Sequence, residues 1–209
     1  MRRQDHNTHN AVSPSCSSEN DVCTFQDGVM LYLHDFIWVL AVILLVFIFA
    51  FRIVVVSGPS MKSTLLDGDC LILIDSMLCG RPQQGDIVIA SKESFRSGEP
   101  IVKRVIATEG QEVNIDFAQG VVYIDGVALE EPYTLTPTNL REGIEFPITV
   151  EAGCVFVMGD NRNNSSDSRC AEIGLVDCRE ILGKAIFLIL PGTDGGERSR
   201  DFSRIGVLP

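Results

Sequence analysis

Apolar and polar residues are distributed differently in the two parts of this chain. Residues 36–51 carry no charge, and the apolar run continues beyond Arg52 through Ile53 to Val56. Counted on to Val56, the run has about 21 residues and makes about 31 Å of helix, close to the hydrocarbon thickness of a bilayer. We therefore expect residues 29–56 to form a single transmembrane anchor, in which Arg52 snorkels to the headgroups near its end.

A cleaved secretory signal and a buried core helix are the alternatives to an anchor. A secretory signal has a shorter apolar stretch, followed by small residues at the cleavage site. A core helix needs a partner that is apolar all round, and no other segment of the sequence offers one. The polar residues 1–28, rich in Ser, Asn and Thr, are typical of a disordered tail. Their few charges do not fix the orientation of the anchor.

After the anchor, apolar residues recur in short runs that Gly, Pro and Asp separate. They nowhere hold a period of 3.6 residues for long, so we predict a mostly β, antiparallel domain over residues 57–209. Asp125-Gly126 between two such runs is a strong signal for a two-residue hairpin. Residues 117–150, with three prolines and several acidic residues, indicate an inserted or more mobile lobe. The expected strands are residues 70–74, 86–90, 101–108, 112–116, 121–124, 127–129, 154–158 and 181–190.

Charge and cysteine content limit the possible functions. The net charge of the chain is -11, and residues 57–209 carry 14 Lys and Arg against 23 Asp and Glu, a difference of -9. A nucleic-acid partner needs a basic face, so we expect none. Five cysteines follow the anchor, an odd number without a zinc-binding spacing. Cys170 and Cys178 are close enough to close a small disulfide loop outside the cytoplasm, or are two small buried residues.

The candidate chemistry begins at Ser60, which follows a Gly-Pro turn directly after the anchor. Such a turn can expose both a hydroxyl and a backbone amide that binds an oxyanion. A nucleophilic serine needs a group that accepts its proton, usually His. All three histidines, His6, His9 and His34, precede the anchor or lie at its entrance. A different base is therefore expected.

Lysine is the remaining base, provided that desolvation lowers its pKa from about 10.4 towards neutrality. Lys103 stands out among the four lysines after the anchor because it lies within an apolar strand, residues 101–106. On a strand, Lys103 points to one face with Ile101 and Val105, and Arg104 to the other, where it can pair with a carboxylate. The alternative is a lysine that snorkels from a sheet edge. A polar block at residues 159–169 has the composition of a side-chain network that supports a site.

These segments resemble the type I bacterial signal peptidases, the Ser-Lys endopeptidases that remove leader peptides from exported proteins. The resemblance covers the chain from the anchor to about Ile189. Ser60-Met61 with Thr64-Leu65 is similar to the nucleophile box of the family, Gly85-Asp86 to the short box that follows, and residues 103–106 to the base box. The last box is matched by residues 159–162 with Ser165, Asp167, Ser168 and Arg169.

The resemblance implies a role for each matched residue. Ser60 is the expected nucleophile, with its own amide as an oxyanion donor, and Lys103 is the expected general base. Ser165 is expected to orient the Lys103 amine. Met61 is expected to line the substrate groove and to meet the membrane. Four charged residues are expected to form supporting ion pairs: Arg104, Asp160, Asp167 and Arg169.

The chain departs from the pattern of the family at a few positions. Gly58 stands where some relatives carry an oxyanion-hole Ser, which leaves the second oxyanion donor open. Many relatives have Pro at Ser63, Gly at Ala107 and Asp at Gln111, and the first two differences can alter turn geometry. No expected catalytic group is lost.

The resemblance also implies a location and partners. Residues 1–28 are expected in the cytoplasm and the peptidase domain, 57–209, outside the cytoplasmic membrane. The expected partners are the lipid bilayer and preproteins that bear a signal peptide, with small residues, commonly Ala, one and three positions before the cut. The substrate is expected to add an extended strand to a sheet edge. No metal or cofactor is implied.

Two other functions share some of these features. Self-cleaving repressors carry a Ser-Lys pair on a related β core, but they are soluble and bind DNA, which the anchor and the acidity do not support. A catalytically silent, membrane-anchored binding or scaffold protein can keep the same fold. The intact Ser60 and Lys103 count against it, because such a protein does not need an amine aimed at a serine.

Overall fold

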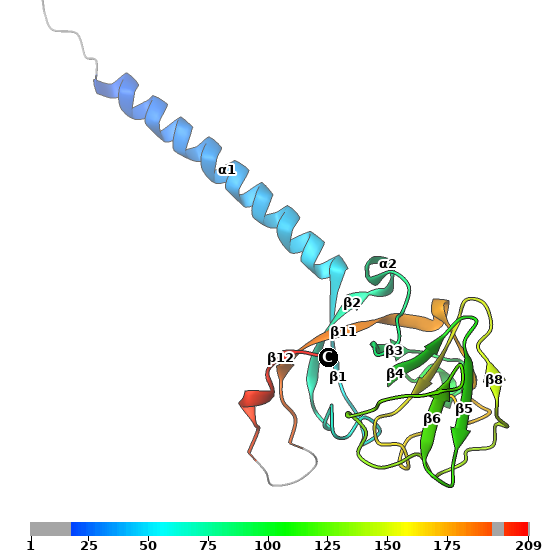
Figure 1. Ribbon diagram of the computed structural model, residues 1–209. Coiled ribbons are helices and arrows are strands. Elements are labelled where there is room, and N and C mark those ends of the chain that lie inside the picture. The colour runs from blue at the N-terminus through cyan, green and yellow to red at the C-terminus, as the bar shows by residue number, and fades with distance from the viewer. Residues whose placement is uncertain (1–17, 194–198, 209) are drawn as a thin grey trace, which may run out of the picture. The chain divides into compact units, whose positions relative to one another are not determined.

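The computed structural model describes residues 18–193 and 199–208 of the chain (Figure 1). The chain divides into two units, residues 1–46 and residues 47–209. The predicted disordered tail falls largely on residues 1–17, which lie outside the described residues.

The first unit holds most of a single long helix, α1 (Ser18–Ala50). Its segment Val29–Ala50 has 22 residues and a mean hydropathy of 2.5, so it is long and apolar enough to cross a membrane by length and composition. The helix begins at Ser18, within the segment that we expected to be a tail. Helix propagation is cooperative, so a stable apolar segment can extend into polar neighbours one residue at a time.

We had expected the apolar run to stay helical to Val56, but it does not. The helix ends at Ala50, and Phe51–Val55 forms strand β1, which pairs with β2 (Cys70–Asp75) in the register Phe51↔Ile74 to Val55↔Cys70. The residues after Arg52 are β-branched, and such residues pack well on a pleated surface and lose side-chain freedom in a helix. The sequence analysis therefore placed the end of the helix too late in the chain, at Val56 instead of Ala50.

The second unit is built on an eight-stranded antiparallel sheet, which confirms the predicted fold class. Its strands follow the order β1-β2-β11-β3-β4-β9-β10, and β12 pairs with β11. Short helices join some of them: α2 (Ser76–Cys79), η1 (Arg96–Gly98), η2 (Cys178–Glu180) and η3 (Phe202–Arg204). The remaining strands of this sheet are β3 (Ile87–Ala90), β4 (Ile101–Thr108), β9 (Cys154–Met158), β10 (Val176–Asp177), β11 (Ile181–Leu190) and β12 (Gly206–Val207).

A four-stranded sheet of order β7-β6-β5-β8 follows β4 in the chain (Figure 1). It contains the predicted hairpin, since Ile124 pairs with Val127 around Asp125-Gly126, whose φ angles are 51° and 78°. The boundary at residue 117, where we expected an inserted lobe to begin, lies between β5 and β6, inside this sheet. The four strands are β5 (Glu112–Asp116), β6 (Val121–Ile124), β7 (Val127–Ala128) and β8 (Ile148–Thr149).

The two sheets share a buried core. Ile106 of β4 and Phe156 of β9 pack in one cluster with Val113 of β5 and Val122 of β6, and all four side chains are fully buried. Burial of apolar area is the main stabilising contribution in such a cluster. The second sheet is thus fixed to the two strands, β4 and β9, that lead into the polar site described next.

Candidate active site

Ser60 lies in a tight turn that begins directly after β1. Gly58 has a φ of 88°, a conformation that favours glycine, and its N–H donates to the Asp67 carboxylate at 2.8 Å. Asn161 holds the turn from the opposite side, because its N–H donates to the Ser60 carbonyl at 3.0 Å and its side-chain amide to the Pro59 carbonyl at 3.1 Å. These bonds fix the backbone on both sides of the Ser60 side chain.

Lys103 reaches Ser60 from β4. Its Nζ lies 2.7 Å from Ser60 Oγ, within hydrogen-bond distance, and the residue is only 3% exposed. The strand register places Lys103 opposite Val88 and Arg104 opposite Ile87 on β3. The structure therefore brings together the serine and the lysine that the sequence singled out, although 43 positions separate them.

Asp167 is the centre of one buried ion pair beside this contact. Arg169 binds it through two parallel bonds, Nε to Oδ1 and Nη2 to Oδ2, both at 2.8 Å. Asp167 Oδ2 also accepts the Ser165 hydroxyl and the Gly159 N–H, each at 3.0 Å. The carboxylate is fully buried and fully satisfied, so it holds Ser165 and Gly159 in fixed positions.

Arg104 and Asp160 form the second buried ion pair. Nε donates to Oδ1 at 2.9 Å and Nη2 to Oδ2 at 2.8 Å, and the side chains are 2% and 0% exposed. Thr64, at the end of the Ser60 turn, donates its hydroxyl to Asp160 Oδ2 at 2.5 Å. The four charged residues that we expected to pair do so as Arg104–Asp160 and Arg169–Asp167, and the first pair ties the turn to β4.

Several residues that surround the site were missed by the sequence analysis. The β7–β8 connection, residues 129–147, contributes Glu131, which binds both terminal nitrogens of the fully buried Arg162. It also contributes Tyr133, whose ring lies 4.0 Å from the Arg104 guanidinium carbon and whose carbonyl accepts the Ser63 hydroxyl. Burial, followed by the charge of Glu131, raises the pKa of Tyr133 to about 12.

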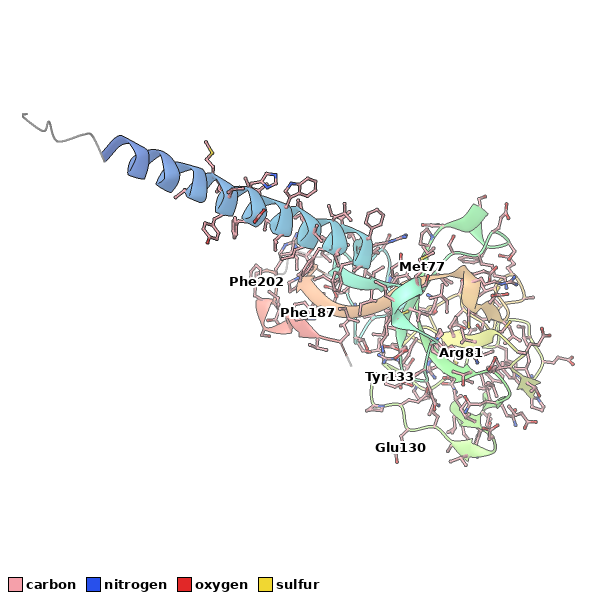
Figure 2. All side chains as sticks on the ribbon, turned by 90° about the horizontal axis from the view of Figure 1, so that it is seen from above. Met77, Arg81, Glu130, Tyr133, Phe187 and Phe202 are labelled. Atoms are coloured by element: carbon pink, nitrogen blue, oxygen red, sulfur yellow. The ribbon has the colours of Figure 1, made fainter. Side chains whose placement is uncertain are left out.

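The β7–β8 connection thus lies over the polar block of residues 159–169. In Figure 2 Glu130 lies at the outer edge of the domain, whereas Tyr133 lies closer to its interior, in agreement with their exposed and half-buried states. A proline-rich acidic segment carries no local pattern that distinguishes such a connection from a mobile loop. The contacts that hold this connection in place are made with residues roughly thirty positions away in the chain, as between Glu131 and Arg162.

The structure bears on the expected roles of Met61 and Gly58. Met61 is 1% exposed and packs in a core cluster with Leu65 and Leu71, so it neither lines the groove nor offers a surface to a membrane. A large apolar side chain in a tight turn is buried more favourably than it is exposed. Gly58 has no side chain that could donate a hydrogen bond to an oxyanion, and its N–H already donates to Asp67.

An open groove of about 680 Å³ runs past Ser60 and Lys103. One wall comes from β1 and the turn after it, another from residues 99–103, and a third from Leu140, Glu142 and residues 163–166. The apolar residues Ile53 and Val55 of β1 are 67% and 63% exposed. Arg52, also on this wall, pairs with Asp75 at 2.7 Å. The groove therefore offers both apolar surface and backbone next to the Ser60 hydroxyl.

Two strand edges border this groove. Among the described strands, β1 is the terminal strand of its sheet, with β2 on one side only. β4 pairs with β9 only from Arg104 onward, so in the described part of the chain one edge of Ile101–Lys103 has no strand partner. Unpaired backbone groups of this kind can bind an extended peptide.

Other polar and sulfur groups do not extend the site. Among the side chains that the structure describes, no three of His, Cys, Asp or Glu are grouped so that they could hold a metal ion. Cys170 and Cys178, for which the sequence left a disulfide open, are both free thiols in the structure. Burial raises the pKa of Cys178, which makes its thiolate less available.

Comparison with known proteins adds to this geometry. Residues 30–190 match the family model described as signal peptidase, peptidase S26. A probable signal peptidase I-1 of Synechocystis sp. is 36% identical over 149 residues, 68% of this chain and 72% of that protein. Signal peptidase I of Bacillus licheniformis is 34% identical over 170 residues, 75% and 89% of the two chains. The crystal structure of a signal peptidase I from Enterococcus faecalis is 31% identical, covers 50% of this chain and 97% of its own, and has a TM-score of 0.41.

Proposed function

Since the chain belongs to the signal peptidase family, peptidase S26, and is a peptide-bond hydrolase, we propose that it removes signal peptides from preproteins with Ser60 as nucleophile and Lys103 as general base. One observation carries the assignment of the two residues: a buried lysine amine lies 2.7 Å from a serine hydroxyl at the floor of an open groove. Burial disfavours the ammonium form and so favours the neutral amine that a general base requires.

The reaction is acyl transfer through an ester. The Lys103 amine accepts the Ser60 proton while Ser60 Oγ attacks the scissile carbonyl, and the leaving amine of the mature protein takes the proton back. Water then attacks the ester carbonyl while Lys103 again accepts a proton. Ser60 Oγ leaves and takes this proton back, which releases the signal peptide with a new carboxyl end. In the described part of the chain the Ser60 N–H has no hydrogen-bond acceptor, which supports its role as an oxyanion donor.

Ser165 and the two buried ion pairs hold Ser60 and Lys103 in place. Ser165 lines the same groove as Lys103 and is itself fixed by Asp167. This arrangement supports the role of Ser165 in orienting the amine. Arg104 and Asp160 fix the end of the Ser60 turn through Thr64. A nucleophile and a base are effective only while their relative geometry is maintained, so we assign these four charged residues a supporting role.

The substrate binds as an extended strand between β1 and the unpaired edge of Ile101–Lys103. Backbone hydrogen bonds to these edges give affinity, and side chains that point into the groove give specificity. The exposed Ile53 and Val55 on the β1 wall suit an apolar leader segment. The partners are therefore preproteins that bear a signal peptide.

Residues 29–50 of α1 anchor the protein in the cytoplasmic membrane as a single span, with residues 1–28 in the cytoplasm and the peptidase domain outside. The length and composition of Val29–Ala50 support the span. Protease added to the outer face of oriented vesicles should digest residues after Ser57. Digestion from the cytoplasmic face alone would reverse the topology.

The cleavage assay uses the full chain in detergent with a preprotein that carries an Ala-x-Ala site. Mass spectrometry of the products should locate one cut after the second Ala. Ser60→Ala and Lys103→Ala should lose activity by at least about 10³-fold, as expected for the nucleophile and base of one reaction. Lys184→Ala is the matched control, because Lys184 is partly exposed, pairs with Asp86 and does not line the groove.

Each outcome of this assay decides between functions. Cleavage by the wild type and by Lys184→Ala, but by neither site variant, supports the proposal. Near-normal cleavage by a folded Lys103→Ala variant excludes Lys103 as the base. No cleavage by any form, with binding of the preprotein retained, favours the silent binding protein of the same fold.

A further inference from the structure

One apolar side chain stands out on the third wall of the groove. Leu140, on the β7–β8 connection, lines the groove together with Lys103 and is 45% exposed. A single exposed leucine is common on protein surfaces, so its meaning depends on how it is held. The other residues that the structure places on this wall are all polar: Glu142, Asn163, Asn164, Ser165 and Ser166.

The backbone of Leu140 is fixed at its N–H by Asn163. The Asn163 side-chain oxygen accepts the N–H groups of Asn139 and Leu140 at 3.1 Å and 3.0 Å. Its side-chain nitrogen donates to the Thr136 hydroxyl at 3.1 Å and to the Pro137 carbonyl at 3.0 Å. These four bonds use the full donor and acceptor capacity of a side-chain amide. Asn163 therefore holds this whole segment beside the groove.

The buried ion pair of Asp167 and Arg169 fixes Leu140 at its carbonyl. Arg169 Nη1 donates to the Leu140 carbonyl at 3.1 Å, and Arg169 itself is fully buried. Asp167 also holds the Ser165 hydroxyl. The position of Leu140 is thus tied to the residue that is proposed to orient the Lys103 amine. A rigidly held apolar side chain loses little further entropy when a ligand packs against it.

We propose that Leu140 is a specificity-determining residue that packs against an apolar side chain of the bound substrate close to the cut. This inference rests on the proposed function and adds a contact to it. An extended substrate between β1 and Ile101–Lys103 directs successive side chains to opposite faces. The third wall meets the side chains on one of these faces, and Leu140 offers them its apolar surface. An apolar substrate residue at this position should therefore be preferred over a polar or charged one.

The first test detects the contact without turnover. A photoreactive benzophenone amino acid replaces Leu140 in the full-length Ser60→Ala protein in detergent, and the preprotein with the Ala-x-Ala site is added before irradiation. Mass spectrometry should locate the crosslink within about three residues of this site, roughly 10 Å along an extended chain. Leu135 is the matched control, because it lies on the same connection and is 51% exposed but does not line the groove. The same amino acid at position 135 should give no such crosslink.

The second test measures kcat/KM with preproteins in which each residue near the cut, other than the two alanines, is changed in turn to Leu, Ser or Asp. In Leu140→Ala the preference for Leu over Ser should fall by about 10-fold at one position, the lower end for an apolar contact because the groove is open to solvent. The preferences at the other positions should not change. In Leu140→Lys the value for Asp at that same position should rise by about 2- to 5-fold, as expected for an exposed ion pair. Leu135→Ala and Leu135→Lys should behave like the wild type.

These outcomes separate the inference from the proposed function. No crosslink from position 140, or an equal crosslink from position 135, overturns the inference. Unchanged preferences in Leu140→Ala also overturn it, and so does a uniform loss at every substrate position, because that pattern indicates a structural role. Absence of cleavage by the wild type overturns the proposed function, and the crosslink from position 140 still decides the inference. Circular dichroism of each variant establishes that it is folded.

Discussion

At the scale of single residues, the close approach of Ser60 and Ser165 depends on an absent side chain. A Cβ at position 159 would lie 2.2 Å from Ser165 Oγ and 2.5 Å from the Ser60 carbonyl oxygen. The first neighbour is held by Asp167 and the second is backbone, so neither can move at low cost. Gly159 is therefore required by packing, and its φ angle is ordinary.

Gly159→Ala should reduce kcat/KM by about 10²-fold or more, because a displacement of about 1 Å in a catalytic group has an effect of this size. Gly206→Ala is the control, since a Cβ at position 206 meets no atom within 4 Å. The readout is preprotein cleavage, with thermal unfolding measured in parallel. Equal activity of the two folded variants would show that the contact at Gly159 relaxes without consequence.

A second residue-scale prediction concerns the effect of pH on stability. The pKa of Glu142 is raised above its ordinary value of 4.5, so the folded chain binds this proton more tightly than the unfolded chain does. The free energy of unfolding therefore falls as pH rises from about 4.5 through the folded-state pKa. Glu142→Gln should be more stable than the wild type at pH 7, and the difference should vanish near pH 4.

Thermal unfolding of both proteins at several pH values measures this difference. Glu145→Gln, on the same connection but exposed, should show no comparable gain. A stability difference that is independent of pH would mean that Gln packs better than Glu and that ionisation has no part in it.

The residues that sequence reasoning could find are those with a local signal. A lysine within an apolar strand and a serine after a Gly-Pro turn are unusual at their own positions, and their contact at 2.7 Å agrees with that reasoning. Met61 carries no such signal, because an apolar residue beside a nucleophile suits either a groove or a core. Glu131 and Glu142 form hydrogen bonds with residues that are distant in sequence, Arg162 and Asp167, and no local pattern reveals such contacts.

At the scale of elements, length and burial decide which strands a pattern can predict. β4 and β11 have 8 and 10 residues and show clear apolar runs. β8, β10 and β12 have 2 residues each, too few for any periodicity. β1 was assigned to the anchor because an apolar strand that follows an apolar helix has no polar boundary. Only its pairing with β2 distinguishes it.

The β7–β8 connection gives the element-scale prediction. The Tyr133 ring packs over the Arg104 guanidinium at 4.0 Å, so Tyr133→Ala should lower the free energy of unfolding by roughly 2 kcal/mol or more through lost packing and the lost cation–π contact. It should also reduce kcat, because Arg104 holds Asp160 and Thr64. Tyr133→Phe keeps the ring and should behave like the wild type in urea unfolding and cleavage. Equal losses in both variants would assign the effect to the hydroxyl instead.

At the scale of the whole molecule, the polypeptide after β11 returns to support the Ser60 turn. Gly192 donates its N–H to Asp69 at 2.6 Å, and a Cβ there would lie 2.0 Å from the Asp67 carbonyl oxygen. Leu208 packs against the core cluster that contains Met61 and Leu65. Residues 199–208 lie outside the segment that matches the family model. The motifs therefore identify the site, whereas the packing that stabilises it comes partly from residues beyond them.

Arg204 makes the strongest of these contacts and gives the last prediction. It binds the fully buried Asp69 at 2.6 Å and 2.9 Å and the Thr64 carbonyl at 3.2 Å. Arg204→Ala leaves a buried carboxylate without its cation, so it should lower the free energy of unfolding by about 3 to 5 kcal/mol. Arg200→Ala, which removes a single bond to the Pro191 carbonyl, should cost about 1 kcal/mol.

Urea unfolding of both variants measures the comparison, and Asp69→Asn combined with Arg204→Ala completes it. Replacing both partners should recover part of the loss, because the uncompensated charge is then gone while the amide can still bind nearby backbone groups. Equal losses for Arg204→Ala and Arg200→Ala would mean that Asp69 is adequately held by the N–H groups of Leu66 and Gly192 alone. The Ser60 turn would then owe its position to the preceding strand and to Asn161, and the segment after β11 would be dispensable for the site.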